Sequence, residues 1–147
     1  MSEEVVTLES LVGQHTLTGV DFETQTFNNG YRDEYCQVVN FVLDGETYTA
    51  SEDPDDGYRS CMREIKKSNN VVKNMFASCN VIGTMRVPDY GTSEIIDLTD
   101  SITRKVVLSV GTENTDDYYP MWVADFTPEN MAVNVIVDCA FVKTCRQ

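Results

Sequence analysis

Alternating apolar and polar positions run through most of the chain and predict β-strands. Residues 15–27 are rich in Thr, Val and Phe, which favours a strand with Gly19 as a bulge. Residues 35–43 form a mostly apolar run typical of a buried strand, and residues 46–50 should return antiparallel to it. Asp44 and Gly45 lie between them and suit the positive-φ positions of a type I′ turn. The pattern therefore predicts a hairpin over residues 35–50.

The strand pattern resumes after residue 70. Residues 71–87 predict one or two strands with a break near Ser78 or Gly83, and further strands are expected over 94–98, 105–112 and 120–126. Thr127 and Pro128 suit the start of a short helical turn. A final strand with one buried face is predicted by strict alternation of apolar residues at Val133, Val135, Val137, Cys139 and Phe141.

One segment shows helical spacing instead. Tyr58, Cys61, Met62 and Ile65 stand at i, i+3, i+4 and i+7, with acidic residues before them and basic residues towards the end. This spacing predicts one main helix over about residues 56–68. We therefore expect an α+β fold, in which this helix packs across a curved, mostly antiparallel β-sheet, as a single domain over residues 1–147.

The acidic charge is concentrated in the first part of the chain. The formal net charge is −13, and residues 1–58 hold 13 Asp or Glu against one basic residue, Arg32. Residues 59–147 hold 11 Asp or Glu against 10 Lys or Arg. Such a charge repels nucleic acid and anionic membranes and attracts basic partners. We expect no direct nucleic-acid or membrane binding.

Cysteine and histidine usage argues against a metal site and a secreted protein. The five cysteines contain no C-x-x-C pair, and His15 is the only histidine, so a zinc ligand set is not expected. The acidic stretch Glu52–Gly57 lacks the ligand spacing of a calcium loop, because it puts Pro54 at position three and Arg63 at position twelve. The start of the chain has no secretory signal pattern, which predicts a cytoplasmic protein.

No catalytic motif is present in the sequence. It contains no G-x-S-x-G elbow, no phosphate-binding P-loop and no G-x-G-x-x-G fingerprint. A nucleophilic triad would have to use His15, which stands in a Thr-rich strand. We therefore expect a protein that is not an enzyme and that needs no cofactor.

Two polar loops, residues 55–60 and 111–120, combine acidic residues with tyrosine and are the predicted contact surface. Tyrosine gives a rigid, amphipathic contact area, and Arg59 could grip a phosphate or carboxylate. An ordinary capped helix and an ordinary hairpin loop would explain the same residues. The candidate binding residues are Asp55, Asp56, Tyr58, Arg59, Asn114, Asp116, Asp117, Tyr118 and Tyr119.

Several short motifs resemble an uncharacterised family of small phage and prophage accessory domains. They are Leu11–Gly13, Asp44-Gly45 followed by Glu46-Thr47-Tyr48, the segment Tyr58–Met62, and the spacing Gly111…Asn114…Tyr118-Tyr119. The resemblance covers most of residues 10–127, and the acidic insert at residues 53–56 departs from it. It implies an accessory protein of phage type, acting in the host cytoplasm, with no catalytic residue to transfer.

These observations favour a non-enzymatic binding protein, such as a phage-encoded factor that inhibits or sequesters a host defence component through an acidic protein–protein interface. The partner would be a host or phage protein with a basic surface. One alternative is capture of a small anionic ligand, such as a nucleotide or phosphorylated molecule, by the Tyr and Arg loops. A structural virion or assembly protein is a further alternative, and a homo-oligomer is left open.

Overall fold

Nine antiparallel strands form one curved sheet in the computed structural model, which describes residues 4–28, 30, 33–54, 60–87, 92–114 and 120–133. Two short 3-10 helices, η1 and η2, accompany the strands. The elements are β1 (Glu4–Val6), η1 (Leu8–Leu11), β2 (Gly13–Asn28), β3 (Asp33–Leu43), β4 (Glu46–Pro54), β5 (Ser60–Lys67), β6 (Met75–Met85), β7 (Thr92–Asp100), β8 (Val106–Asn114), β9 (Met121–Phe126) and η2 (Pro128–Asn130). The strand order is β1-β5-β4-β3-β2-β6-β7-β8-β9.

The expected α+β fold with a main helix over about 56–68 is wrong, because the described part of this segment is strand β5. The register with β4 pairs Ser51 with Glu64 and Glu52 with Met62, so Arg63 is an extra residue in β5. A bulge of this kind lets two residues three positions apart point to the same face. Met62 and Ile65 therefore both reach the core, and their spacing imitated that of a helix.

Most of the predicted strands are confirmed. The shift in register between Leu17 and Gly19 is the expected bulge, and Asp44 and Gly45 both have positive φ, at 55° and 81°, in the predicted hairpin turn. Residues 71–87 contain one strand without a break, β6, and β8 pairs with β9 as expected. Pro128 begins the predicted helical turn, η2. The predicted final strand falls almost entirely on residues outside the described part.

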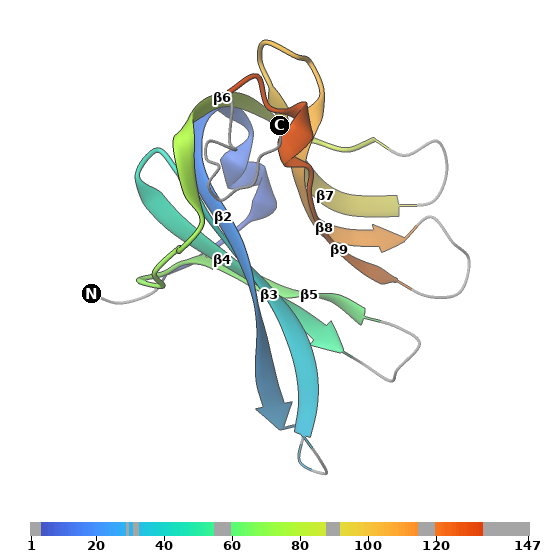
Figure 1. Ribbon diagram of the computed structural model, residues 1–147. Helices are drawn as coiled ribbons and strands as arrows, with labels where there is room; N and C mark the ends of the chain where they lie inside the picture. The colour runs from blue at the N-terminus through green and yellow to red at the C-terminus, as the bar shows by residue number, and fades with distance from the viewer. Residues whose placement is uncertain are drawn as a thin grey trace.

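Curvature of the sheet lets its two halves share one core (Figure 1). Phe41, Ala50 and Ile65 from β3 to β5 belong to the same buried cluster as Ile96 and Val110 from β7 and β8. The sheet nearly closes where β5 approaches β9: the Ser60 amide donates to the Pro120 carbonyl at 3.4 Å, and the Met62 amide donates to Thr112 Oγ1 at 2.8 Å. Burial of the apolar faces of these strands drives this closure.

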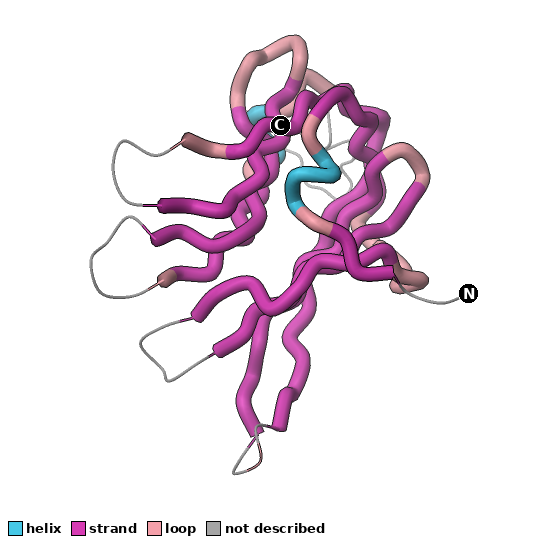
Figure 2. The backbone as a smooth tube through the Cα atoms, turned by 180° about the vertical axis from the view of Figure 1, so that it is seen from behind, coloured by secondary structure: helices cyan, strands magenta, loops and turns pink. Residues whose placement is uncertain are grey.

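The helix η1 lies against the inside of the sheet, as Figure 2 shows from behind. Its Leu8 and Leu11 are buried in the core cluster. Gly83 of β6 makes this packing possible, because a Cβ at that position would stand 2.2 Å from the Leu11 carbonyl oxygen. Among the described residues, no helix is long and apolar enough to cross a membrane.

The hairpin of β2 and β3 extends beyond the rest of the sheet as a two-stranded arm (Figure 1). β2 pairs with β3 as far as Asn28, but β6 pairs with β2 only up to Gly19. On the other side, β4 pairs with β3 only from Val38 onwards. We call residues 21–28 and 33–37 the acidic arm, since it carries Asp21, Glu23, Asp33 and Glu34.

Candidate functional site

The predicted binding residues lie almost entirely outside the described part of the chain. This applies to Asp55, Asp56, Tyr58, Arg59, Asp116, Asp117, Tyr118 and Tyr119. Asn114 is described: it is the exposed last residue of β8 and pairs with Thr92. Ser60 and Pro120, the last residues of the two predicted loops, are described and are joined by a backbone hydrogen bond. The structure therefore brings one end of each loop together, while the contact surface itself stays a prediction.

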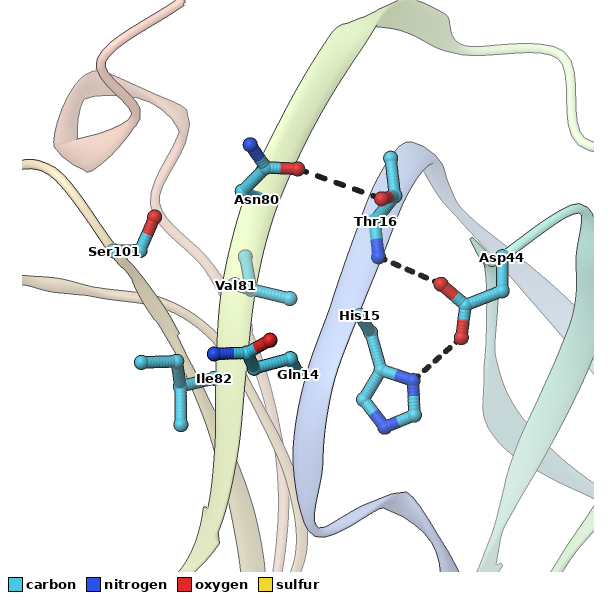
Figure 3. A pocket seen from close by; sticks show the side chains of 8 residues that line it. All are labelled: Gln14, His15, Thr16, Asp44, Asn80, Val81, Ile82 and Ser101. Atoms are coloured by element: carbon cyan, nitrogen blue, oxygen red, sulfur yellow. Dashed lines mark hydrogen bonds and ion pairs between the residues drawn. The ribbon is translucent and has the colours of Figure 1, made fainter.

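His15 is one of the residues that line an open polar cleft of about 390 Å³ along β2 and β6 (Figure 3). Its Nδ1 is 2.7 Å from Asp44 Oδ2, and its Nε2 donates to the Leu11 carbonyl at 2.8 Å. The Thr16 amide donates to the other oxygen of Asp44 at 2.8 Å. The hydrogen bond from His15 lowers the pKa of Asp44 below its ordinary value, burial opposes this, and the Thr16 amide adds to it.

The His15–Asp44 pair is unsuited to catalysis of the triad kind. A triad histidine uses one nitrogen for the aspartate and keeps the other for the proton of a nucleophile. Here the second nitrogen is bound to a backbone carbonyl, so it has no place for a nucleophile. The pair instead ties β2 to the turn between β3 and β4, which sets the position of the hairpin.

Arg86 is committed to a structural contact. It donates from Nε and Nη2 to the two oxygens of Asp97 at 3.0 and 2.8 Å, and Ser109 donates to Asp97 at 2.6 Å. This hydrogen bonding to Asp97 raises the pKa of Arg86, although burial opposes the shift. A guanidinium held in this two-pronged way on β7 has few donors left for an anionic ligand.

Asp100 at the end of β7 is also occupied by the fold. Its carboxylate accepts from the amides of Ile102, Thr103 and Ala132 and from the Cys79 thiol. Burial acts to raise the pKa of Asp100, but these donors outweigh it and leave the pKa lowered. Burial, aided by Asp100, raises the pKa of the Cys79 thiol to about 12. This pair therefore holds a turn and offers no reactive thiolate.

The carboxylates at the base of the acidic arm differ from those of Asp44, Asp97 and Asp100, because they face outward and are aligned by a buried amide side chain. Asn40 of β3 is fully buried, and its Nδ2 donates to Asp21 Oδ1 at 3.2 Å and to Glu23 Oε2 at 2.5 Å. Its Oδ1 accepts from Thr49 at 2.6 Å and from Asn70 at 3.0 Å. A fully satisfied network of this kind is rigid, so the two carboxylates are held side by side.

A cleft of about 420 Å³ opens beside these two carboxylates. It lies between β2 and the segment that leads into β6, and the Lys73 amide donates to Asp21 Oδ2 at 2.6 Å across one end. Its lining residues are Asp21, Phe22, Glu23, Asn70, Val71, Lys73 and Asn74. Phe22 is 41% exposed and Val71 is 78% exposed, so apolar surface adjoins the acidic pair.

The basic side chains of β5 lie away from Asp21 and Glu23 of β2. Lys67 of β5 lies 3.9 Å from Glu4, and Lys66 lies 3.6 Å from Glu64, so β5 brings basic side chains to the β1 end of the sheet. Among the described residues, no basic side chain forms an ion pair with Asp21 or Glu23. Part of the acidic surface predicted for residues 1–58 thus lies on the arm.

Sequence reasoning did not single out Asp21, Glu23 or Asn40. The i, i+2 spacing of the two acids in a predicted strand does place them on one face, which was the available signal. The buried Asn40 gave no such signal, because its partners Thr49 and Asn70 come from other elements. No group of three or more metal-ligating side chains was found in the described part of the chain.

Comparisons of the chain with protein-family models, with curated proteins and with solved structures found no match. The resemblance to phage accessory domains therefore stays a prediction.

Proposed function

We propose that this protein is a non-enzymatic binding protein that docks on a basic surface of another protein through its acidic arm. The observation that carries the proposal is the pair Asp21 and Glu23, fixed by the buried Asn40 and without a basic partner among the described residues. Aligned carboxylates on a rigid strand attract a cationic surface and steer its approach.

The local charge supports this reading. Residues 13–54, which contain β2 to β4, hold eight Asp or Glu and one basic residue, Arg32. Asp44, which binds His15, and Asp100 are less suited to docking than the arm, because their carboxylates accept hydrogen bonds that hold the fold together. If the chain is an accessory protein of phage type, its partner is a host protein, and binding would inhibit or sequester it.

Salt dependence tests the proposal. The probe is a fluorescein-labelled peptide of alternating Lys and Val, and binding is measured by fluorescence anisotropy. Between about 20 mM and about 300 mM NaCl the Debye length falls from roughly 20 Å to under 8 Å, so we expect the affinity to fall at least tenfold. Affinity that is unchanged over this range would contradict an acidic interface.

The double variant Asp21→Asn and Glu23→Gln locates the interface. Both amides keep an oxygen that accepts from Asn40, so the hydrogen bonds of Asn40 are retained, and only the hydrogen bond from the Lys73 amide to Asp21 is lost. We expect weaker binding and a shallower salt dependence. Glu129→Gln is the matched control, because Glu129 is exposed in η2 and outside the arm, and its affinity should match that of the unchanged chain.

Capture of a small anionic ligand is the second candidate, and the hydrogen bond between Ser60 and Pro120 favours it. That bond brings together one end of each loop that carries the predicted Tyr and Arg residues. Thermal unfolding with a panel of nucleotides tests it, since a ligand at 100 times its dissociation constant stabilises by about 2.7 kcal/mol. No shift with any nucleotide would argue against this candidate.

A further inference from the structure

The outer edge of β2 along the acidic arm has no partner strand among the described residues. β6 stops pairing at Gly19, and the last contact on this side is made by Asn74, whose carbonyl accepts from the Val20 amide at 3.1 Å and whose side chain donates to the Val20 carbonyl at 3.0 Å. Backbone groups of a strand alternate in direction. The amides and carbonyls of Phe22, Thr24 and Thr26 therefore point the same way as those of Val20, away from β3.

We propose that this edge accepts an extended basic segment of the partner protein as an additional antiparallel or parallel β-strand. An unpaired edge is a template for main-chain hydrogen bonds, and alternate side chains then give specificity. The proposal rests on the proposed function and names the mode by which the acidic arm binds.

The two faces of the arm define the chemistry of that segment. Asp21 and Glu23 project from one face beside the edge, so side chains of the added strand on that face should be Lys or Arg. Phe22, Thr24 and Thr26 project from the other face, where Tyr35 of β3 is 73% exposed. Side chains on that face should be β-branched or aromatic, since such cross-strand neighbours stabilise a sheet. A segment that alternates basic and apolar residues meets both requirements.

The cleft at Asp21 gives the segment a place to begin. It opens where β6 leaves β2, and Phe22 and Val71 supply apolar surface in it. A second copy of this chain is a poor occupant, because its arm would bring the same carboxylates against Asp21 and Glu23. Charge complementarity therefore favours a different, basic protein.

The first test removes edge hydrogen bonds from the peptide, which leaves the protein unchanged. The probe is the labelled peptide of alternating Lys and Val. It is compared with two versions N-methylated at alternate residues, each of which removes the amide donors along one edge of the peptide strand. We expect one version to bind at least about tenfold more weakly and the other to bind like the parent. Equal affinity of all three peptides would overturn strand addition while leaving an acidic interface intact.

The second test removes a donor from the protein. Thr24→Pro deletes an amide that faces away from β3, a place where a strand tolerates proline. Thr24→Val is the matched control, because it keeps the amide and the shape of the side chain. We expect Thr24→Pro to lose at least about tenfold in affinity and Thr24→Val to keep it. Similar affinity of the two variants would count against the edge as the site.

Nuclear magnetic resonance supplies a readout that a purely electrostatic complex would not give. With the peptide bound, the amides of Phe22, Thr24 and Thr26 should become protected from hydrogen exchange, and those of Glu94 and Glu129 should not change. Absence of protection in a saturated complex overturns the proposal but not the proposed function. Failure of the chain to bind the peptide would overturn the named occupant. A homodimer, detected by gel filtration, whose edge amides are already protected without the peptide would overturn it as well.

Discussion

At the scale of single residues, the most connected carboxylate of the described chain is Asp100. It accepts from three backbone amides, those of Ile102, Thr103 and Ala132, and so joins the turn after β7 to the segment that follows η2. An aspartate in this position acts as a fixed acceptor for groups that would otherwise be buried without partners. Its contribution is expected to depend on its ionised state.

Asp100→Asn should lower the free energy of unfolding by about 1–3 kcal/mol at pH 7, since hydrogen bonds to a charged acceptor are lost. The lowered pKa of Asp100 sets the sign of the pH dependence. Its stabilisation is complete above the unfolded-state pKa of about 3.9 and is lost as the pH falls towards the folded-state pKa. Urea unfolding at pH 7 and at about pH 3 should show the variant and the parent converging. Asp125→Asn, at an exposed position of β9, is the control and should change little.

Cys79 is expected to resist alkylation in the folded protein. With its thiol pKa raised to about 12, only about one molecule in ten thousand carries a thiolate at pH 8. Native labelling with iodoacetamide, read by peptide mass spectrometry, should modify Cys79 only after urea is added. Cys61 is less buried and serves as the internal comparison. Equal labelling of the two residues in the native state would show that the environment of Cys79 is more open than described.

Short-range chemistry made some of these residues predictable. Asp44 and Gly45 are adjacent, and their tolerance of positive φ sufficed to place the turn. The contact of Asp44 with His15 spans 29 positions, and that of Asp100 with Ala132 spans 32. Such contacts depend on which strands are neighbours, and strand order is not encoded in the local alternation of apolar residues. The networks that fix the candidate site were therefore beyond the sequence.

At the scale of elements, β5 shows how a local pattern can indicate the wrong structure. Periodicity identifies a face and leaves open whether a helix or a bulged strand produces it. The extra residue Arg63 moved Met62 and Ile65 onto one face, and acidic and basic residues at the two ends completed the appearance of a helix. The other strands were predictable because their alternation is regular or because turn residues mark their ends.

Because η1 packs closely on β6, adding a single methyl group at Gly83 of β6 should strongly lower the stability of the fold. Gly83→Ala would place a Cβ 2.2 Å from the Leu11 carbonyl oxygen, and the clash with backbone forces η1 away from the sheet. We expect a loss of at least about 1–3 kcal/mol in the free energy of unfolding. Ser78→Ala, at an exposed position of the same strand, should stay within about 0.5 kcal/mol of the parent. Urea unfolding of both variants is the measurement, and similar stabilities would mean that η1 does not sit on Gly83.

At the scale of the whole molecule, the charge of −13 should make salt act in opposite directions on stability and on binding. Screening weakens repulsion among the carboxylates of the compact state, so raising NaCl from about 20 mM to about 500 mM should raise the urea midpoint of unfolding. The same screening weakens attraction to a basic partner, so affinity should fall over the same range.

The Asp21→Asn and Glu23→Gln double variant should reduce both responses, because the two carboxylates contribute to the repulsion and to the docking surface. The single variant Glu23→Gln should have a urea midpoint at low salt at or above that of the parent, since its amide oxygen keeps the hydrogen bond from Asn40, whereas Asp21→Asn also loses the hydrogen bond from the Lys73 amide. A parent chain that loses stability in salt would show that ion pairs such as Arg86–Asp97 outweigh the repulsion. If salt changes the affinity of the parent for its partner but not its urea midpoint, the carboxylates of the acidic arm affect binding and not stability. A surface maintained for recognition should behave in this way.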